Sequence, residues 1–210
     1  SYLLRGINRG FSGTPYEAEE TGDRGYSLDT WPQEYPAFGT GDYRRSCVLA
    51  EHEDGSQAAE FLYVSHRICP GKYSLPGLPA LRAGKEEAQT LEIRLKDRCT
   101  GLEVLLYYGV LEQEDVITRA CILENTGSAP VILHRAMSCC VDFLRGDLDL
   151  ITFPGRHAME RKLQRDKTRP GVCSVGSTRG TSSHQENPFV ILCEKEAGEY
   201  QGACWGAAFV

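Results

Sequence analysis

The feature that most constrains the fold is an alternation of apolar and polar residues that recurs from Cys47 onward. In TLEIRLKD, Leu91, Ile93 and Leu95 alternate with charged side chains. Similar runs rich in Val, Ile, Leu and Tyr are interrupted by Gly or Asn/Asp turns about every ten residues. A period of two places alternate side chains on opposite faces of a strand, which is typical of antiparallel sheets. We therefore predict an all-β chain with about ten or more strands, forming a large antiparallel β-sandwich over residues 47–210.

Four segments give more specific expectations. CVLAEHEDGSQAAEFLYVSHRI, which begins at Cys47, predicts two strands joined through a turn at residues 54–56. Residues 73–84 contain Pro76 and Pro79 and predict a loop. GVCSVGSTRG, residues 171–180, is expected to be a strand. HAMERKLQRDK, residues 157–167, is expected to contain a strand; a helix is the alternative, but Met159 and Leu163 are too few for an apolar stripe.

Residues 1–46 differ from the rest of the chain. Gly and Pro interrupt this region too often for a helix, and no alternation is present. Disordered segments are poor in aromatic residues, whereas this region contains Phe11, Tyr16, Tyr26, Trp31, Tyr35, Phe38 and Tyr43. We predict a long ordered loop region that lies over a surface or an interface.

Charge and hydropathy exclude several classes of partner. The chain has 210 residues, a net charge of -6 and no basic cluster, so a nucleic-acid partner is not expected, because phosphate binding needs concentrated Lys and Arg. No apolar run approaches the roughly 20 residues of a membrane span. We therefore expect neither nucleic-acid nor membrane partners.

The nine cysteines show no C-x-x-C motif and no zinc-ligand spacing with histidine. Most lie in apolar runs such as RACILEN. We expect free thiols that act as small buried apolar groups in a reducing cytoplasm, and no metal or organic cofactor. A disulfide or a metal site is the alternative.

Two kinds of catalytic site can be considered from the residues alone. Ser183 and His184 are adjacent, but neighbours on a strand point to opposite faces, and no G-x-S-x-G motif is present. Glycoside hydrolysis needs two carboxylates at a defined separation. Acidic residues are numerous, but sequence alone does not pair them: Asp29, Glu34, Asp42, Asp142, Asp147 and Asp149.

The segment SLDTWPQEYPAFGTGDYR, residues 27–44, combines aromatic rings with charged groups. Sugars stack their C–H faces on aromatic rings and bind carboxylates and guanidinium groups through their hydroxyls. The segment therefore suits sugar binding. It equally suits an aromatic loop that packs on the sandwich or on a partner subunit.

Six separated motifs resemble the N-terminal domain of glycoside hydrolase family 36, the microbial α-galactosidases, and the resemblance covers essentially the whole chain. They are NRGFSG (8–13), SLDTWPQEYPAFGTGDYR (27–44), GLPA (77–80), VITR (116–119), VDF (141–143) and SSHQENPFVIL (182–192). The resemblance implies a β-supersandwich, in agreement with the predicted strands. It also implies that the chain is a segment of a longer enzyme, truncated at both ends.

In this family a downstream (β/α)8 barrel carries both catalytic aspartates of a retaining mechanism, so the resemblance implies no catalytic residue in this segment. It further implies a cytoplasmic homo-oligomer, expected to be a tetramer, that acts on α-galactoside oligosaccharides of the melibiose and raffinose type. Loops of the N-terminal domain would reach a neighbouring subunit's active site. A stand-alone carbohydrate-binding or assembly module and an α-N-acetylgalactosaminidase are the alternatives.

The resemblance also assigns roles to individual residues. Asn8 and Arg24 are expected to contact substrate near the galactose site, with Asp23 as a further candidate. Structural or interface roles are expected for Trp31, Asp42, Ser183, His184 and Asn187. For Ser182 to Asn187, we expect the polar side chains to satisfy buried backbone groups where a turn meets a strand; lining an interface is the alternative.

Overall fold

The computed structural model describes residues 32–39, 44–143, 145–177 and 185–209. The chain divides into two compact units, the first ending at Asp142 and the second running from Phe143 to Val210. The described residues form ten β-strands and one short 3-10 helix, and contain no α-helix. The strands pair in antiparallel sheets. The predicted all-β, antiparallel fold class is confirmed.

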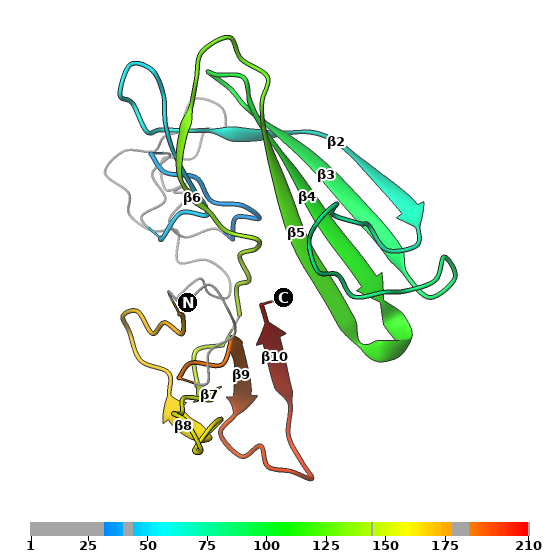
Figure 1. Ribbon diagram of the computed structural model, residues 1–210, viewed down its shortest axis with the longest axis vertical. Helices are drawn as coiled ribbons and strands as arrows, with labels where there is room; N and C mark the ends of the chain where they lie inside the picture. Colours follow the sequence, from blue (N-terminus) through cyan, green and yellow to red (C-terminus); the bar gives the residue numbers. More distant parts are fainter. Residues whose placement is uncertain (1–31, 40–43, 144, 178–184, 210) are drawn as a thin grey trace. The chain divides into compact units, whose positions relative to one another are not determined.

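A four-stranded meander forms most of the first unit. Its strands are β2 (Phe61–Pro70), β3 (Gln89–Asp97), β4 (Leu102–Leu111) and β5 (Val116–Asn125), and each pairs with the next in the chain (Figure 1). The 3-10 helix η2 (Glu112–Glu114) connects β4 to β5 and ends at Asp115, whose φ is 51°. The β3–β4 and β4–β5 connections are short, as is usual between antiparallel neighbours, whereas the longer segment 71–88 connects β2 to β3.

A second, two-stranded sheet completes the first unit. It pairs β1 (Val48–Glu51) with β6 (Ile132–Ala136), with a register shift between Leu49 and Ala50. The core contains residues from both sheets and from the segment before β1: Tyr35, Cys47, Val48, Ala50, Leu95, Leu102, Val104 and Leu106. Leu102, Val104 and Leu106 occupy alternate positions of β4 and therefore point to one face, which is the face that packs in this core.

The second unit contains a four-stranded antiparallel sheet with the order β10-β9-β7-β8. Its strands are β7 (Leu148–Thr152), β8 (Gln164–Lys167), β9 (Phe189–Glu194) and β10 (Cys204–Ala208). Phe153 and Phe189 stack with ring centroids 5.7 Å apart, and Phe143 packs edge-on against Trp205. β10 is an edge strand, and all five of its residues are exposed.

Of four local expectations, one differs from the structure. The two strands expected from residue 47 onward form as β1 and β2 and are joined through a turn, although they pair with β6 and β3 and not with each other. Residues 172–177, the described part of the strand expected at 171–180, form no strand. The segment at residues 157–167 contains the strand β8, as expected, and not the alternative helix, because Met159 and Leu163 are both more than half exposed and provide no buried stripe. The loop expected at residues 73–84 is present.

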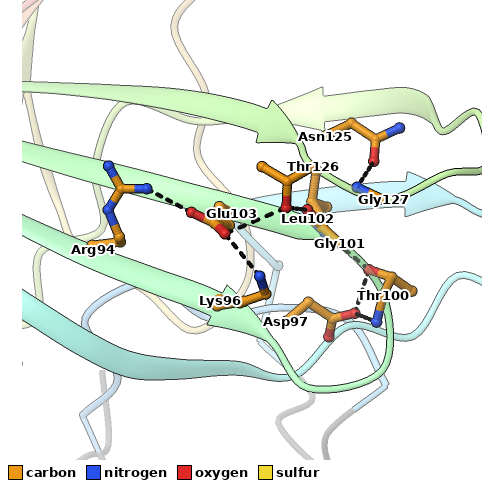
Figure 2. Close-up of polar contacts among 10 residues, drawn as sticks. All are labelled: Arg94, Lys96, Asp97, Thr100, Gly101, Leu102, Glu103, Asn125, Thr126 and Gly127. Atoms are coloured by element: carbon orange, nitrogen blue, oxygen red, sulfur yellow. Dashed lines mark hydrogen bonds and ion pairs between the residues drawn. The ribbon is translucent and has the colours of Figure 1, made fainter.

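A polar network joins the β3–β4 turn to the end of β5 (Figure 2). Glu103 accepts hydrogen bonds from Arg94 at 2.6 Å and Lys96 at 2.9 Å, and lies 3.3 Å from the Thr126 hydroxyl. Hydrogen bonds from Lys96 and Arg94 lower the pKa of the Glu103 carboxyl below its usual 4.5. The network therefore stabilises the ionised carboxylate on the face of the meander opposite the core.

The free energy of unfolding should decrease in acid, in part because the Glu103 carboxylate becomes protonated. Because its folded-state pKa lies below 4.5, its contribution is present above the unfolded-state pKa and is lost as pH falls through the folded-state value. We expect the urea unfolding midpoint to fall between about pH 6 and pH 3, and to fall less steeply in Glu103→Gln. Parallel pH profiles for the two proteins would contradict this assignment.

Candidate functional site

The described end of the long loop region is attached to the core alongside β1. Ala37 forms a parallel bridge with Val48, and the backbone N–H of Cys47 donates to the Pro36 carbonyl at 2.7 Å. The N–H of Ala59 donates to the Phe38 carbonyl at 3.0 Å. Residues 36–38 are therefore held by backbone hydrogen bonds from two separate segments of the first unit.

Tyr35 fixes this segment through its side chain. The ring is buried, and the hydroxyl donates to the Met137 carbonyl at 2.7 Å. The Cys121 thiol lies 3.3 Å from the same hydroxyl and donates to the same carbonyl. Burial, and secondly the contact with Cys121, raises the pKa of the Tyr35 hydroxyl. Tyr35 is a neutral hydrogen-bond donor in the core, and this supports the interpretation of the loop as packed on the sandwich.

Glu34 and Arg119 form the polar edge of this attachment. Arg119 Nη2 donates to Glu34 Oε1 at 3.1 Å, and its guanidinium lies 3.5 Å from the centroid of the Tyr108 ring. The Arg119 side chain is 11% exposed, whereas that of Glu34 is 51% exposed. Burial raises the pKa of Glu34, with Arg119 acting in the opposite direction. The Tyr108 hydroxyl is buried without a hydrogen-bond partner within the described ranges.

A second ion pair connects the loop region to the end of the first unit. Arg44 Nη1 donates to Asp142 Oδ2 at 3.0 Å, and each side chain is 16% exposed. Arg44 belongs to the 27–44 motif and Asp142 to VDF, just as Glu34 and Arg119 join the 27–44 motif to VITR. Two ion pairs thus connect the 27–44 motif to VITR and to VDF, both of which are far from it in the sequence.

The described carboxylates that were candidates for catalysis each contact an arginine. Besides Glu34 and Asp142, Asp147 pairs with Arg145 at 3.1 Å and Asp149 pairs with Arg165 at 2.8 Å. The other two candidates, Asp29 and Asp42, lie outside the described residues. Because each of these carboxylates already binds a guanidinium group, the contacts suit the attachment of one segment to another.

Most of the predicted site residues lie outside the described ranges. They are Asn8, Asp23, Arg24, Trp31, Asp42, Ser182, Ser183 and His184. Asn187 is described: its N–H donates to the Phe153 carbonyl at 3.3 Å, and its carbonyl accepts from Phe189 at 2.8 Å. The carbonyl of Gln185 accepts from Gly155 at 3.0 Å. The backbone of residues 185–187 is thus hydrogen-bonded to that of residues 153–155, just before β9 begins. The roles of the side chains in this segment stay a prediction.

All nine cysteines are free thiols. A hydrogen bond with Cys140, followed by burial, raises the pKa of the Cys47 thiol, and burial raises that of Cys139. These environments oppose thiolate formation, so neither group is an activated nucleophile. Within the described part of the chain, no group of three His, Cys, Asp or Glu side chains could hold a metal ion. The same part contains no helix long and apolar enough to cross a membrane.

Arg119 is the residue that sequence analysis missed. It belongs to VITR, yet nothing in our interpretation of that motif gave it a function. The available signal was the position of Arg119 in the strand. In β5, Ile117, Arg119 and Cys121 lie on the face that packs on the core, so a cation stands where the alternating pattern would place an apolar residue. A buried cation requires a partner, and Glu34 was among the carboxylates already considered.

Comparisons with known proteins agree on one family. Residues 5–210 match the family model described as the glycosyl hydrolase family 36 N-terminal domain. The chain is 50% identical over 209 residues to the bifunctional alpha-galactosidase/sucrose kinase AgaSK of Mediterraneibacter gnavus, covering 100% of this chain and 22% of that protein. It is 44% identical over 205 residues to alpha-galactosidase AgaA of Geobacillus stearothermophilus, covering 97% and 28%, respectively.

The structural comparison gives the same result. The crystal structure of AgaA superposes with a TM-score of 0.89 at 42% identity, over 98% of this chain and 29% of that one. The galactosidase domain of AgaSK also gives 0.89, at 50% identity. The chain thus spans between about a fifth and a third of the length of these relatives.

Proposed function

The chain belongs to glycosyl hydrolase family 36, whose N-terminal domain it matches over residues 5–210, and from this membership we propose that it is the non-catalytic domain of a retaining α-galactosidase. The full-length protein would remove terminal α-galactose from oligosaccharides of the melibiose and raffinose type. A downstream barrel would supply both catalytic aspartates, and no cofactor would be needed. The observation that carries this proposal is identity of 44–50% to two α-galactosidases over nearly the whole chain.

The substrate class has support from the relatives. AgaA variants have been crystallised in complex with raffinose and with stachyose. At 43% identity over 97–98% of this chain, we extend the same class of α-galactosides to the protein containing it. A stand-alone carbohydrate-binding module and an α-N-acetylgalactosaminidase remain as outcomes of the experiment below.

For the segment itself, we propose two roles in a cytoplasmic homo-oligomer, with a tetramer expected. It would organise the assembly, and the loop region would complete the substrate pocket with Asn8, Arg24 and Asp23. The ion pairs Glu34–Arg119 and Arg44–Asp142, together with buried Tyr35, support this proposal because they attach the described end of the loop region firmly to the core. Trp31, Asp42, Ser183, His184 and Asn187 would then serve structural or interface roles.

The division of roles can be tested by hydrolysis of p-nitrophenyl α-galactoside. We expect turnover by the full-length protein and none by the 210-residue segment. Turnover by the segment would place a catalytic carboxylate pair within it and contradict the proposal. Inactivity of a correctly assembled full-length protein towards this substrate, with galactose binding by the segment, would favour the binding module. Turnover only of the α-N-acetylgalactosaminide would favour the other specificity.

Replacing Arg24 by alanine in the full-length protein tests the pocket assignment. Loss of a charge-assisted hydrogen bond to substrate should lower kcat/KM by roughly 10- to 100-fold without changing the oligomer. Arg67→Ala is a matched control, because Arg67 lies on β2 with its side chain 67% exposed and pairs with Glu92. Steady-state kinetics and light scattering are the measurements. Equal kinetics of Arg24→Ala and Arg67→Ala would remove Arg24 from the substrate site.

A further inference from the structure

Two cysteines of the second unit lie directly opposite each other on neighbouring strands. Cys193 is in β9 and Cys204 opens β10, two neighbouring strands (Figure 1). The antiparallel register places the two cysteines opposite each other. The N–H of Glu194 donates to the Ala203 carbonyl at 3.0 Å, and that of Phe209 donates to the Pro188 carbonyl at 3.0 Å. Hydrogen-bonded and non-hydrogen-bonded pairs alternate along an antiparallel ladder. Both observed bonds place Cys193 and Cys204 in a non-hydrogen-bonded pair.

This position suits a disulfide. In a non-hydrogen-bonded pair the two Cα atoms lie about 4.5 Å apart, and both side chains project from the same face of the sheet. Disulfides span Cα separations of about 4.4–6.8 Å. Both thiols are free in the structure, so the pair is a dithiol that needs no change of register to become linked.

The two thiols differ in access. Cys204 is exposed on the edge strand, whereas Cys193 is 2% exposed. On the same face, Asp149 of β7 is the other cross-strand partner of Cys193, and the Arg165 guanidinium binds Asp149 at 2.8 Å. One cysteine can therefore meet a reagent from solution, and the other can be reached only from its partner. This is the arrangement of an attacking and a resolving thiol.

We propose that Cys193 and Cys204 form a redox-modification site that a small-molecule disulfide, such as oxidised glutathione, converts into a cross-strand disulfide. The Cys204 thiolate attacks one sulfur of the reagent, forming a mixed disulfide and releasing one thiol. The Cys193 thiolate then attacks the Cys204 sulfur and releases the second thiol. The protein loses two hydrogens, and the reagent is reduced to two thiols.

The expected consequence is a covalent link between β10 and the rest of its sheet. Among the described strands, β10 pairs only with β9, and all five of its residues are exposed, so its opening is resisted mainly by five paired residues. Closing the short connection through a disulfide removes conformations of the opened state. Amide exchange over Cys204–Ala208 should slow by at least about tenfold on oxidation.

The test uses the full-length protein and does not depend on its activity. Samples treated with oxidised glutathione or with dithiothreitol are alkylated, digested without reductant and analysed by mass spectrometry. We expect a Cys193–Cys204 linked peptide after oxidation and its loss after reduction. Cys193→Ser should accumulate glutathione on Cys204, whereas Cys204→Ser should leave Cys193 unmodified.

Cys99 provides the control, because it is exposed at the β3–β4 turn and has no cysteine opposite it in the described register. Cys99→Ser should leave the cross-link unchanged. The proposal is overturned if Cys193 and Cys204 are both alkylated after oxidation. It is equally overturned if wild-type Cys204 retains glutathione or links to another molecule instead of Cys193.

Discussion

Replacing Gly101 by alanine is expected to destabilise the first unit by about 3 kcal/mol, because the new methyl group has no space. A Cβ atom at Gly101 would lie 2.0 Å from the backbone nitrogen of Gly127 and 2.2 Å from its Cα. These are backbone atoms, so a change of rotamer cannot relieve the overlap. The Gly101 carbonyl also accepts hydrogen bonds at 2.7 Å from both the N–H and the hydroxyl of Thr126 (Figure 2).

The measurement is urea denaturation of the full-length protein, combined with hydrogen exchange in β4 and β5. Local exchange is needed because unfolding of a multidomain protein is not always two-state. Gly146→Ala is the matched control, since a Cβ at Gly146 would meet nothing within 4 Å. If Gly101→Ala and Gly146→Ala had the same midpoint and the same exchange rates, the close approach of the two backbones would not be a constraint.

The strands of the meander could be predicted from sequence because each carries its own signal. Leu91, Ile93 and Leu95 alternate with charge in β3, whereas β4 is mostly apolar and is buried along most of its length. Partner choice was not predictable in the same way. A turn signal lies between β1 and β2, yet the partner of β1 is β6, about 80 residues later. The local alternation of apolar and polar residues determines that a strand forms. Which strand it pairs with depends on which apolar faces become buried together in the folded core.

Two segments of the second unit carry a weaker signal than the strands of the meander. β8, Gln164–Lys167, has four exposed polar residues and is a strand because β7 offers it a free edge. In residues 172–177, Val172 and Val175 are three positions apart and would point to opposite faces of a strand, and Val172 is 80% exposed. Two apolar residues that cannot share a buried face are not sufficient for a strand.

The candidate site was predictable at the level of motifs and not at the level of contacts. The motifs that meet at Glu34–Arg119 and Arg44–Asp142 were recognised separately, and nothing in sequence order places residue 34 beside residue 119. Tyr35 lies in the segment for which sugar binding and packing on the sandwich were both considered, and its buried hydroxyl, which binds the Met137 carbonyl, agrees with packing. An aromatic residue with a polar tip suits a wet pocket and a core equally well, so composition could not separate the two roles.

Asp97→Ala should destabilise the first unit by about 2–4 kcal/mol, because one buried carboxylate satisfies groups on two separate segments. Asp97 is 2% exposed. Its Oδ1 accepts from the Glu60 N–H at 2.6 Å, and its Oδ2 accepts from the N–H of Thr100 at 2.8 Å and from the Thr100 hydroxyl. Alanine would leave these donors buried beside a small cavity. Asparagine keeps one acceptor oxygen and should therefore cost less.

A matched comparison separates this buried role from an ordinary turn contact. Asp54 also accepts a backbone hydrogen bond, from Ser56 at 2.9 Å, but in an exposed turn. Water can replace that carboxylate, so Asp54→Ala should shift the urea midpoint much less than Asp97→Ala. The order expected for the loss of stability is Asp97→Ala, then Asp97→Asn, then Asp54→Ala. If Asp97→Ala were no more harmful than Asp54→Ala, the start of β2 and the β3–β4 turn would be held together by packing of the core instead.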